Sequence, residues 1–229
     1  MPERPMPSWM RDRHLAADVE DLGRADPLWP GQLATLVALL LYLALPVQLT
    51  LGPNWIIPLA EGAGLVALVL ATRAGRTEAR RRGLAIGLVS LAVVANLTAL
   101  GLLTHYLIAG GRASGSNLIG GGVLIWTTNW LLFGVLYWEI DRGGPVRPAG
   151  TKPAPDLLFP QMSDPGFAPR GWMPTFVDYL YVSLTNQTAF SPTDTMPLTI
   201  RLKLLMGVQG VAGLVTTGVI VARAVNILG

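Results

Sequence analysis

Long runs without a charged side chain constrain this sequence more than any other feature. Residues 31–60, 83–111, 114–138 and 204–222 contain no Asp, Glu, Lys or Arg. A bilayer-spanning helix needs about 20 consecutive apolar residues, and each run meets or approaches that length. Charged residues make up only 14% of the chain, whereas soluble domains carry about 25%. The sequence therefore predicts an all-α fold, a polytopic helical membrane protein with five or six transmembrane helices.

The charge pattern divides the N-terminal part of the chain into a tail and a helical region. Residues 1–30 form a polar tail, in which "HLAADVEDLGR" has the spacing of an amphipathic helix; a disordered tail fits the same residues. Residues 31–140 are expected to form four transmembrane helices, at about 32–51, 55–72, 83–109 and 121–139. Pro46 is expected to kink the first of them. Tyr137 and Trp138 are expected to anchor the fourth at the membrane interface.

The C-terminal part divides into a linker and a second helical region. Residues 141–171 contain seven prolines, which predicts a linker with neither helix nor sheet ladder. Residues 172–229 contain a short polar helical stretch and a last apolar span at about 198–226.

Basic residues predict the orientation in the membrane. Residues 73–82 contain five arginines, and basic residues beside spans favour the cytoplasm. We therefore expect this segment, the N-terminal tail and the linker to be cytoplasmic.

Composition also narrows the function classes. The chain has no cysteine and shows no nucleophile elbow, phosphate-binding loop, dinucleotide fingerprint or metal-ligand cluster. We expect no enzyme, no cofactor and no metal site. The net charge of +3 comes largely from loop arginines and does not suggest a nucleic-acid partner.

The stretch "DYLYVSLTNQTAFSPTDTMP", residues 178–197, places hydroxyls and amides just before the last span. Pro174 favours a helix start, and Pro192 disfavours a helical conformation at Ser191. About 16 residues between them would span roughly 24 Å, less than the ~30 Å hydrocarbon core. A re-entrant half-helix fits these facts, and so does an amphipathic surface helix or a sixth, polar span.

From Asp178 to the last span, the sequence resembles the pore domain of potassium-channel-type proteins, over about 50 residues. Asp194 and Pro197 match that family's D-x-x-P, Thr188 matches its first filter threonine, and Thr185 lies on the preceding pore helix. Gly213 falls near the family's hinge glycine. Close helix packing is the preferred interpretation of the glycines in the last span, and a hinge at Gly213 is the other. The resemblance implies a module of pore helix, loop and inner helix over 172–229, and a tetramer. The chain is also similar to an uncharacterised bacterial family of integral membrane proteins, which implies the bacterial inner membrane.

The filter itself departs from the potassium-channel pattern. Ser191, Pro192 and Thr193 stand where that family has Gly, Tyr and Gly, so the usual ladder of carbonyls is not expected. Two main functions remain open: a poorly selective channel for monovalent cations, and a non-conducting membrane scaffold or accessory subunit. The channel family's loop enters from outside, whereas the arginines here predict entry from the cytoplasm.

Glu61 lies within the second predicted span and is the remaining candidate residue. Intramembrane carboxylates are costly and often functional, so Glu61 is a candidate proton or cation site, also usable by a small-solute transporter. A carboxylate near the outer interface, hydrogen-bonded to a neighbouring helix, is the other interpretation. Asn96 and the stretch "TTN", residues 127–129, are expected to join helices through hydrogen bonds.

Overall fold

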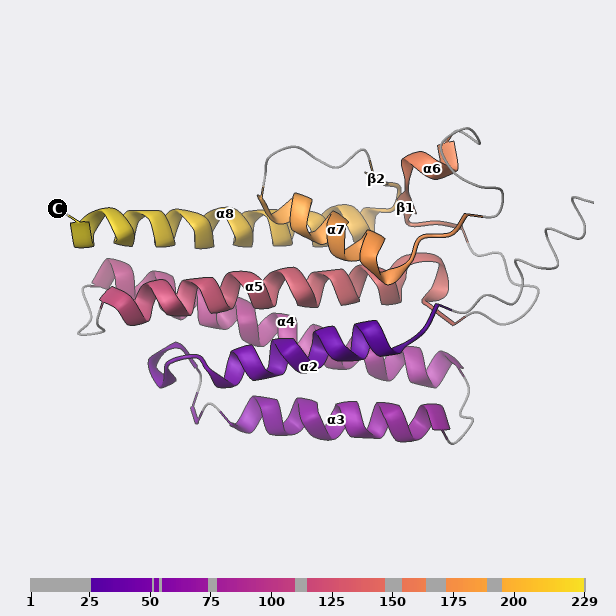
Figure 1. Ribbon diagram of the computed structural model, residues 1–229, viewed down its shortest axis with the longest axis horizontal. Helices are drawn as coiled ribbons and strands as arrows, with labels where there is room; N and C mark the ends of the chain where they lie inside the picture. Colours follow the sequence, from indigo (N-terminus) through magenta and orange to yellow (C-terminus); the bar gives the residue numbers. More distant parts are fainter. Residues whose placement is uncertain are drawn as a thin grey trace, which may run out of the picture.

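The computed structural model describes residues 26–50, 52–53, 55–73, 78–109, 115–146, 154–163, 172–188 and 195–228. Long helices run along one axis (Figure 1). In chain order the helices are α2 (Trp29–Leu43), α3 (Ile56–Arg73), α4 (Glu78–Ala109), α5 (Gly115–Ile140), α6 (Pro160–Ser163), α7 (Phe176–Thr188) and α8 (Ile200–Leu228). Two 3-10 turns, η1 (Val47–Leu49) and η2 (Asp141–Gly143), and a two-stranded pair, β1 (Leu157–Leu158) with β2 (Met196–Pro197), complete the described part.

Three of these helices are long and apolar enough to cross a membrane, within Glu78–Ala109, Asn117–Gly143 and Ile200–Val225. The apolar parts of α2 and α3 are shorter. Large apolar side chains point outward along the bundle, as a lipid-facing surface requires, among them Leu40, Val66, Val94 and Val211. The mainly helical fold predicted from the uncharged runs is confirmed at this level.

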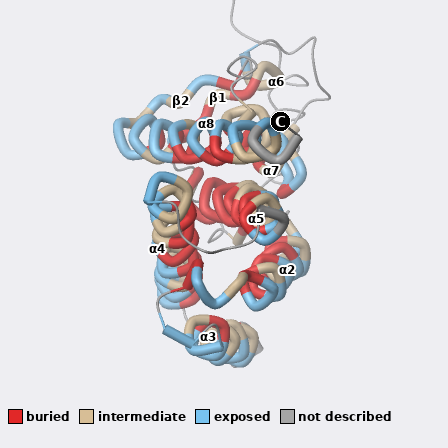
Figure 2. Tube along the Cα trace, turned by 90° about the vertical axis from the view of Figure 1, so that its left-hand side faces the viewer, coloured by how far each residue is buried: buried red, intermediate tan, exposed pale blue. Residues whose placement is uncertain are grey.

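Helix α5 is the centre of the bundle. Figure 2 shows α7 and α8 on one side of it, α4 and α2 flanking it, and α3 at the far edge. Phe133 and Tyr137 of α5 are fully buried, and they belong to a core that extends to α2, α4, α7 and α8. Tyr137 and Trp138 were predicted to be interfacial anchors, and this was wrong, because α7, α8 and the start of α2 cover them.

The first predicted span ends earlier than expected. Helix α2 stops at Leu43, and η1 begins after Pro46. A proline disfavours the helical conformation of the residue before it and lacks an N–H, so the chain ends the helix there and does not kink through it.

The proline-rich linker also differs from its prediction. Leu157 and Leu158 pair antiparallel with Pro197 and Met196, and residues 160–163 form one turn of helix. The prediction of neither helix nor sheet was therefore wrong for this part. Pro155 and Pro160 leave a gap of four residues, which is enough for the short strand.

Helices α7 and α8 begin at the same end of the bundle, where α5 finishes (Figure 1). Near the start of α7, the Tyr179 hydroxyl donates a 2.6 Å hydrogen bond to Asp141, just after α5. Asp141 also accepts the Leu157 N–H of the strand pair at 3.1 Å. At the start of α8, Arg201 donates to Asp156 at 2.9 Å. We call this end of the molecule the polar end.

Candidate functional site

The start of α7 is capped from two directions. Thr175 donates its N–H and its hydroxyl to the Asp178 carboxylate, at 2.7 and 2.9 Å. Asp26 accepts the Phe176 N–H at 2.9 Å and the Trp138 indole N–H at 2.8 Å. Carboxylates satisfy the free N–H groups of a helix start and interact favourably with its dipole. These contacts fix where α7 begins, at the polar end.

Polar side chains then hold α7 against α5. The Trp130 indole donates to the Leu180 carbonyl at 2.9 Å, and the Ser183 hydroxyl donates to the Trp130 carbonyl at 2.7 Å. One turn further, Asn129 donates to Gln187 Oε1 at 2.8 Å, while Gln187 Nε2 donates to the Trp126 carbonyl at 2.8 Å. Each helix therefore both donates to and accepts from the other.

Gln209 of α8 joins the same cluster from the third helix. It is fully buried, and its Oε1 accepts hydrogen bonds from the Tyr137 hydroxyl at 2.7 Å and from Asn186 at 2.8 Å. Its Nε2 donates to the Ser183 carbonyl at 3.0 Å and to the Ser183 hydroxyl at 2.6 Å. We call this cluster the docking network: Asn129, Tyr137, Ser183, Asn186, Gln187 and Gln209.

The docking network accounts for both side-chain amides of the stretch 178–197, Asn186 and Gln187. Without water, a polar group at membrane depth must find its partner inside the protein. Asn186 and Gln187 find theirs on α5 and α8, so they fasten a helix that is too short to cross. Thirteen residues rise only about 20 Å.

Gly213 lets α8 approach the far end of α7. A Cβ at this position would lie 2.5 Å from the Gln187 carbonyl oxygen and 2.6 Å from its Cγ. Helix α8 runs without a break from Ile200 to Leu228. The packing role weighed for Gly213 is therefore visible, and the hinge remains a prediction.

The predicted pore residues fall into two groups. The Thr185 hydroxyl donates to the Tyr181 carbonyl at 2.9 Å, and the Thr188 hydroxyl donates to the Thr185 carbonyl at 3.1 Å, so both bond within α7. Both side chains are partly exposed. The other predicted pore residues lie outside the described residues: Ser191, Pro192, Thr193 and Asp194.

Glu61 does not join this site. It lies on α3, which packs against α2 and α4 and is at the far edge of the bundle from α8 (Figures 1 and 2). The predicted helix-joining role is confirmed for Asn96 and Asn129, whereas the Thr127 hydroxyl donates to the Val123 carbonyl of its own helix at 2.9 Å. Asn96 donates to the Ile125 carbonyl at 3.2 Å, and Asn129 belongs to the docking network.

A buried ion pair at the polar end was missed by the sequence analysis. Arg81 donates to both oxygens of Glu139, at 3.0 and 3.1 Å, and the side chains are only 3% and 4% exposed. Arg82 donates to the carbonyls of Glu139 and Ile140, at 2.9 and 3.0 Å. Helix α4 begins at Glu78, so part of the arginine run is helical and not loop. Glu139 ends the fourth predicted span, and the arginines precede the third. Both positions were predicted to lie on the same side of the membrane, and that was the available signal.

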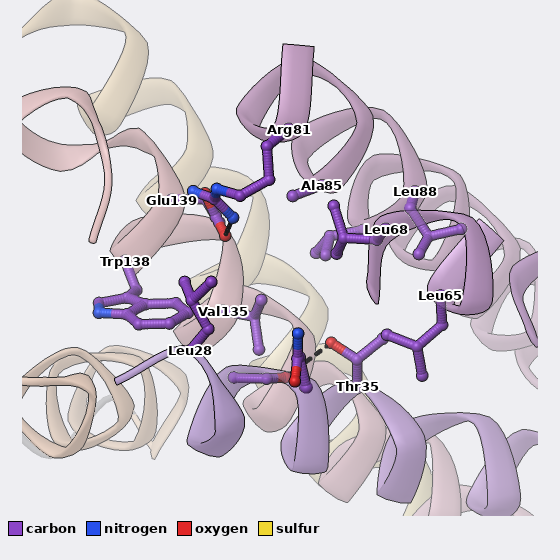
Figure 3. Close-up of a pocket in the computed structure, with 13 residues that line it drawn as sticks. Leu28, Thr35, Leu65, Leu68, Arg81, Ala85, Leu88, Val135, Trp138 and Glu139 are labelled. Carbon is purple, nitrogen blue, oxygen red and sulfur yellow. Dashed lines mark hydrogen bonds and ion pairs between the residues drawn. The ribbon is translucent and has the colours of Figure 1, made fainter. Parts of the chain in front are cut away.

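Figure 3 shows a small cavity beside this ion pair, between α2, α3, α4 and α5. Its volume of about 20 Å³ is sufficient for one water molecule. Most of its lining is apolar, including Leu68, Val89 and Val135. Arg81 and Glu139 are bonded to each other, and the Thr35 hydroxyl in the lining donates to the Gly31 carbonyl at 2.9 Å.

Comparisons with known proteins give no relative for this chain. No family model, no curated protein and no solved structure matches it.

Proposed function

We propose that the protein crosses a bacterial inner membrane five times, with its N-terminus in the cytoplasm and α7 re-entering from the cytoplasmic side. Helices α2, α3, α4, α5 and α8 are the proposed spans. The arginines of 73–82 favour a cytoplasmic position for the polar end. Because α7 and α8 start together at that end, the chain between them has to return to it.

The proposed function is that of an oligomeric membrane protein with a polar, cation-favouring pathway beside the C-terminal end of α7. The observation that carries it is the docking of a 13-residue helix against α5 and α8, with its C-terminal end partway along the bundle (Figure 1). The carbonyl end of a helix carries a partial negative charge. The next residues add hydroxyls at Ser191 and Thr193 and the carboxylate of Asp194, and no Lys or Arg occurs in 171–200.

Chain length limits the route of the returning segment. Eight residue steps separate Thr188 from Met196, and eight steps span at most about 29 Å. The segment has to cover roughly the 20 Å length of α7. Polar backbone at this depth is tolerated only where protein surrounds it or water fills a cavity. A single copy cannot surround a pore, so the proposal includes a homo-oligomer, with four copies implied by the channel resemblance.

A non-conducting scaffold or accessory subunit is the second candidate. It is favoured by the docking network, in which the amides of α7 bond inside the chain and leave no side-chain amide pointing to a pathway. In that case α7 fills a groove between α5 and α8, and the hydroxyls of Thr185 and Thr188 bond only within α7.

Ion flux from purified protein in liposomes separates these candidates. We expect cation flux with weak discrimination between potassium and sodium, because the carbonyl ladder is missing. Asp194→Asn should lower the flux about tenfold, since it removes a charge that concentrates cations. Asp194→Glu keeps the charge and should retain most of the flux.

Two results would each contradict a part of this proposal. Strong potassium selectivity would contradict the argument about the filter. A complete absence of flux, together with a monomer by mass measurement in detergent and in lipid, would leave the scaffold.

A further inference from the structure

Glu61 is a buried carboxyl with an unsatisfied oxygen. The residue is 3% exposed, and its Oε1 has no hydrogen-bond partner among the described residues. It lies in the second turn of α3, about 8 Å from the helix start and at the end opposite the polar end. The surrounding turns of α3 are apolar, and its other charged residue, Arg73, is at the far terminus.

The described surroundings contain nothing that balances a negative charge. No ion pair of the described residues involves Glu61. One polar neighbour is Tyr42 of α2, which is 5% exposed and lies within electrostatic range of the carboxyl. A phenol can donate a hydrogen bond but carries no positive charge near neutral pH. An ionised carboxylate in such a place is far more costly than the neutral acid.

The same protein provides two contrasting glutamates. Glu139 is as deeply buried, but Arg81 bonds to both its oxygens, so a carboxylate is stabilised there. Glu78 is 39% exposed and pairs with Arg81 at 3.0 Å. Of these three carboxyls, only Glu61 combines deep burial with the absence of a cation.

We propose that Glu61 is a proton-binding site within the membrane, where α3 packs against α2 and α4. The carboxyl is held as the neutral acid in the assembled bundle, and it exchanges its proton only when a path from the nearby end of α3 admits water. This site is separate from α7 and independent of any conduction there.

An apolar carbodiimide reports directly on such a carboxyl. The acid adds across one N=C bond of the reagent: its oxygen bonds to the central carbon, and its proton goes to nitrogen. The acyl group then moves from that oxygen to the other nitrogen of the reagent, and the central carbon becomes a carbonyl. The product is a stable N-acylurea, which adds the mass of one reagent molecule. The reaction needs no oxidant or reductant, and it requires a protonated carboxyl that an apolar reagent can reach.

The test is treatment of the protein in lipid vesicles with dicyclohexylcarbodiimide at neutral pH, followed by peptide mass measurement. We expect modification at Glu61 to exceed that at Glu139 and Glu78 by roughly tenfold or more, because only Glu61 is held uncharged. Glu61→Gln should lose the modification and stay folded, since glutamine has the shape of the neutral acid.

Three outcomes would overturn the proposal, and each is measured on the native sequence. The first is an unmodified Glu61 in vesicles when acid-unfolded protein is modified there. The second is equal modification of Glu61 and Glu139. The third is protection of Glu61 by sodium but not by choline, which would mean that the site holds a metal cation in place of a proton.

Discussion

Replacing Arg81 with alanine is expected to lower the free energy of unfolding by about 3–5 kcal/mol, because it leaves the Glu139 carboxylate buried without its partner. The Glu139 side chain is 4% exposed, and the Arg81 guanidinium donates one hydrogen bond to each of its carboxylate oxygens. Unfolding of purified protein in mixed micelles, followed by circular dichroism, would measure the loss.

Two further variants isolate the cause. Arg80→Ala changes an exposed residue one position earlier and should shift stability by no more than about 0.5 kcal/mol. The double variant Arg81→Met with Glu139→Leu should recover most of the loss, since apolar residues replace a buried ion pair at little cost. A single variant Arg81→Ala that unfolds like Arg80→Ala would show that the pair does not hold α4 to α5.

Replacing Gly213 with alanine is expected to destabilise the protein by about 1–3 kcal/mol, the usual effect of adding a methyl group to a filled site. Its Cβ would lie 2.5 Å from the Gln187 carbonyl oxygen. This oxygen belongs to the backbone, so it cannot move away without shifting the end of α7. The loss should exceed the gain of about 1 kcal/mol that alanine normally brings to a helix.

Gly218→Ala is the matched control on the same helix. A Cβ at Gly218 meets nothing within 4 Å, so the change should stabilise α8 by up to about 1 kcal/mol. Opposite signs for the two variants, measured by thermal unfolding in detergent, are the expected result. If both changes stabilise the protein, α7 does not pack on Gly213 as described.

The positions of the helices could be predicted because membrane spans leave a simple signal. The predicted second span, about 55–72, and the last, about 198–226, differ from α3 and α8 by a residue or two at each end. The short helix was also predicted, because Pro174 favours a helix start and the stretch that follows it is too short for a full membrane span. These properties depend on local composition and on proline, which a single sequence shows directly.

The partners of the buried side chains could not be predicted in the same way. Tyr137 and Trp138 are residues typical of an interface, yet α7, α8 and the start of α2 cover them. Arg81 lies in a run of arginines that is typical of a loop between membrane spans, and its burial depends on Glu139, 58 residues away. Composition gives the type of each group, whereas the docking of α7 determines which groups meet.

The central claim is that α7 enters and leaves at one end of the bundle, and cysteine labelling tests it most directly. The chain has no native cysteine, so single cysteines placed at Thr175, before α7, and at Leu198, before α8, are clean reporters; both residues are exposed. With an impermeant maleimide, we expect both to react only after the membrane of intact cells is permeabilised, like a reference cysteine at Arg76. Labelling of Thr175 and Leu198 from opposite sides would mean that residues 176–197 cross the membrane, and would contradict the account.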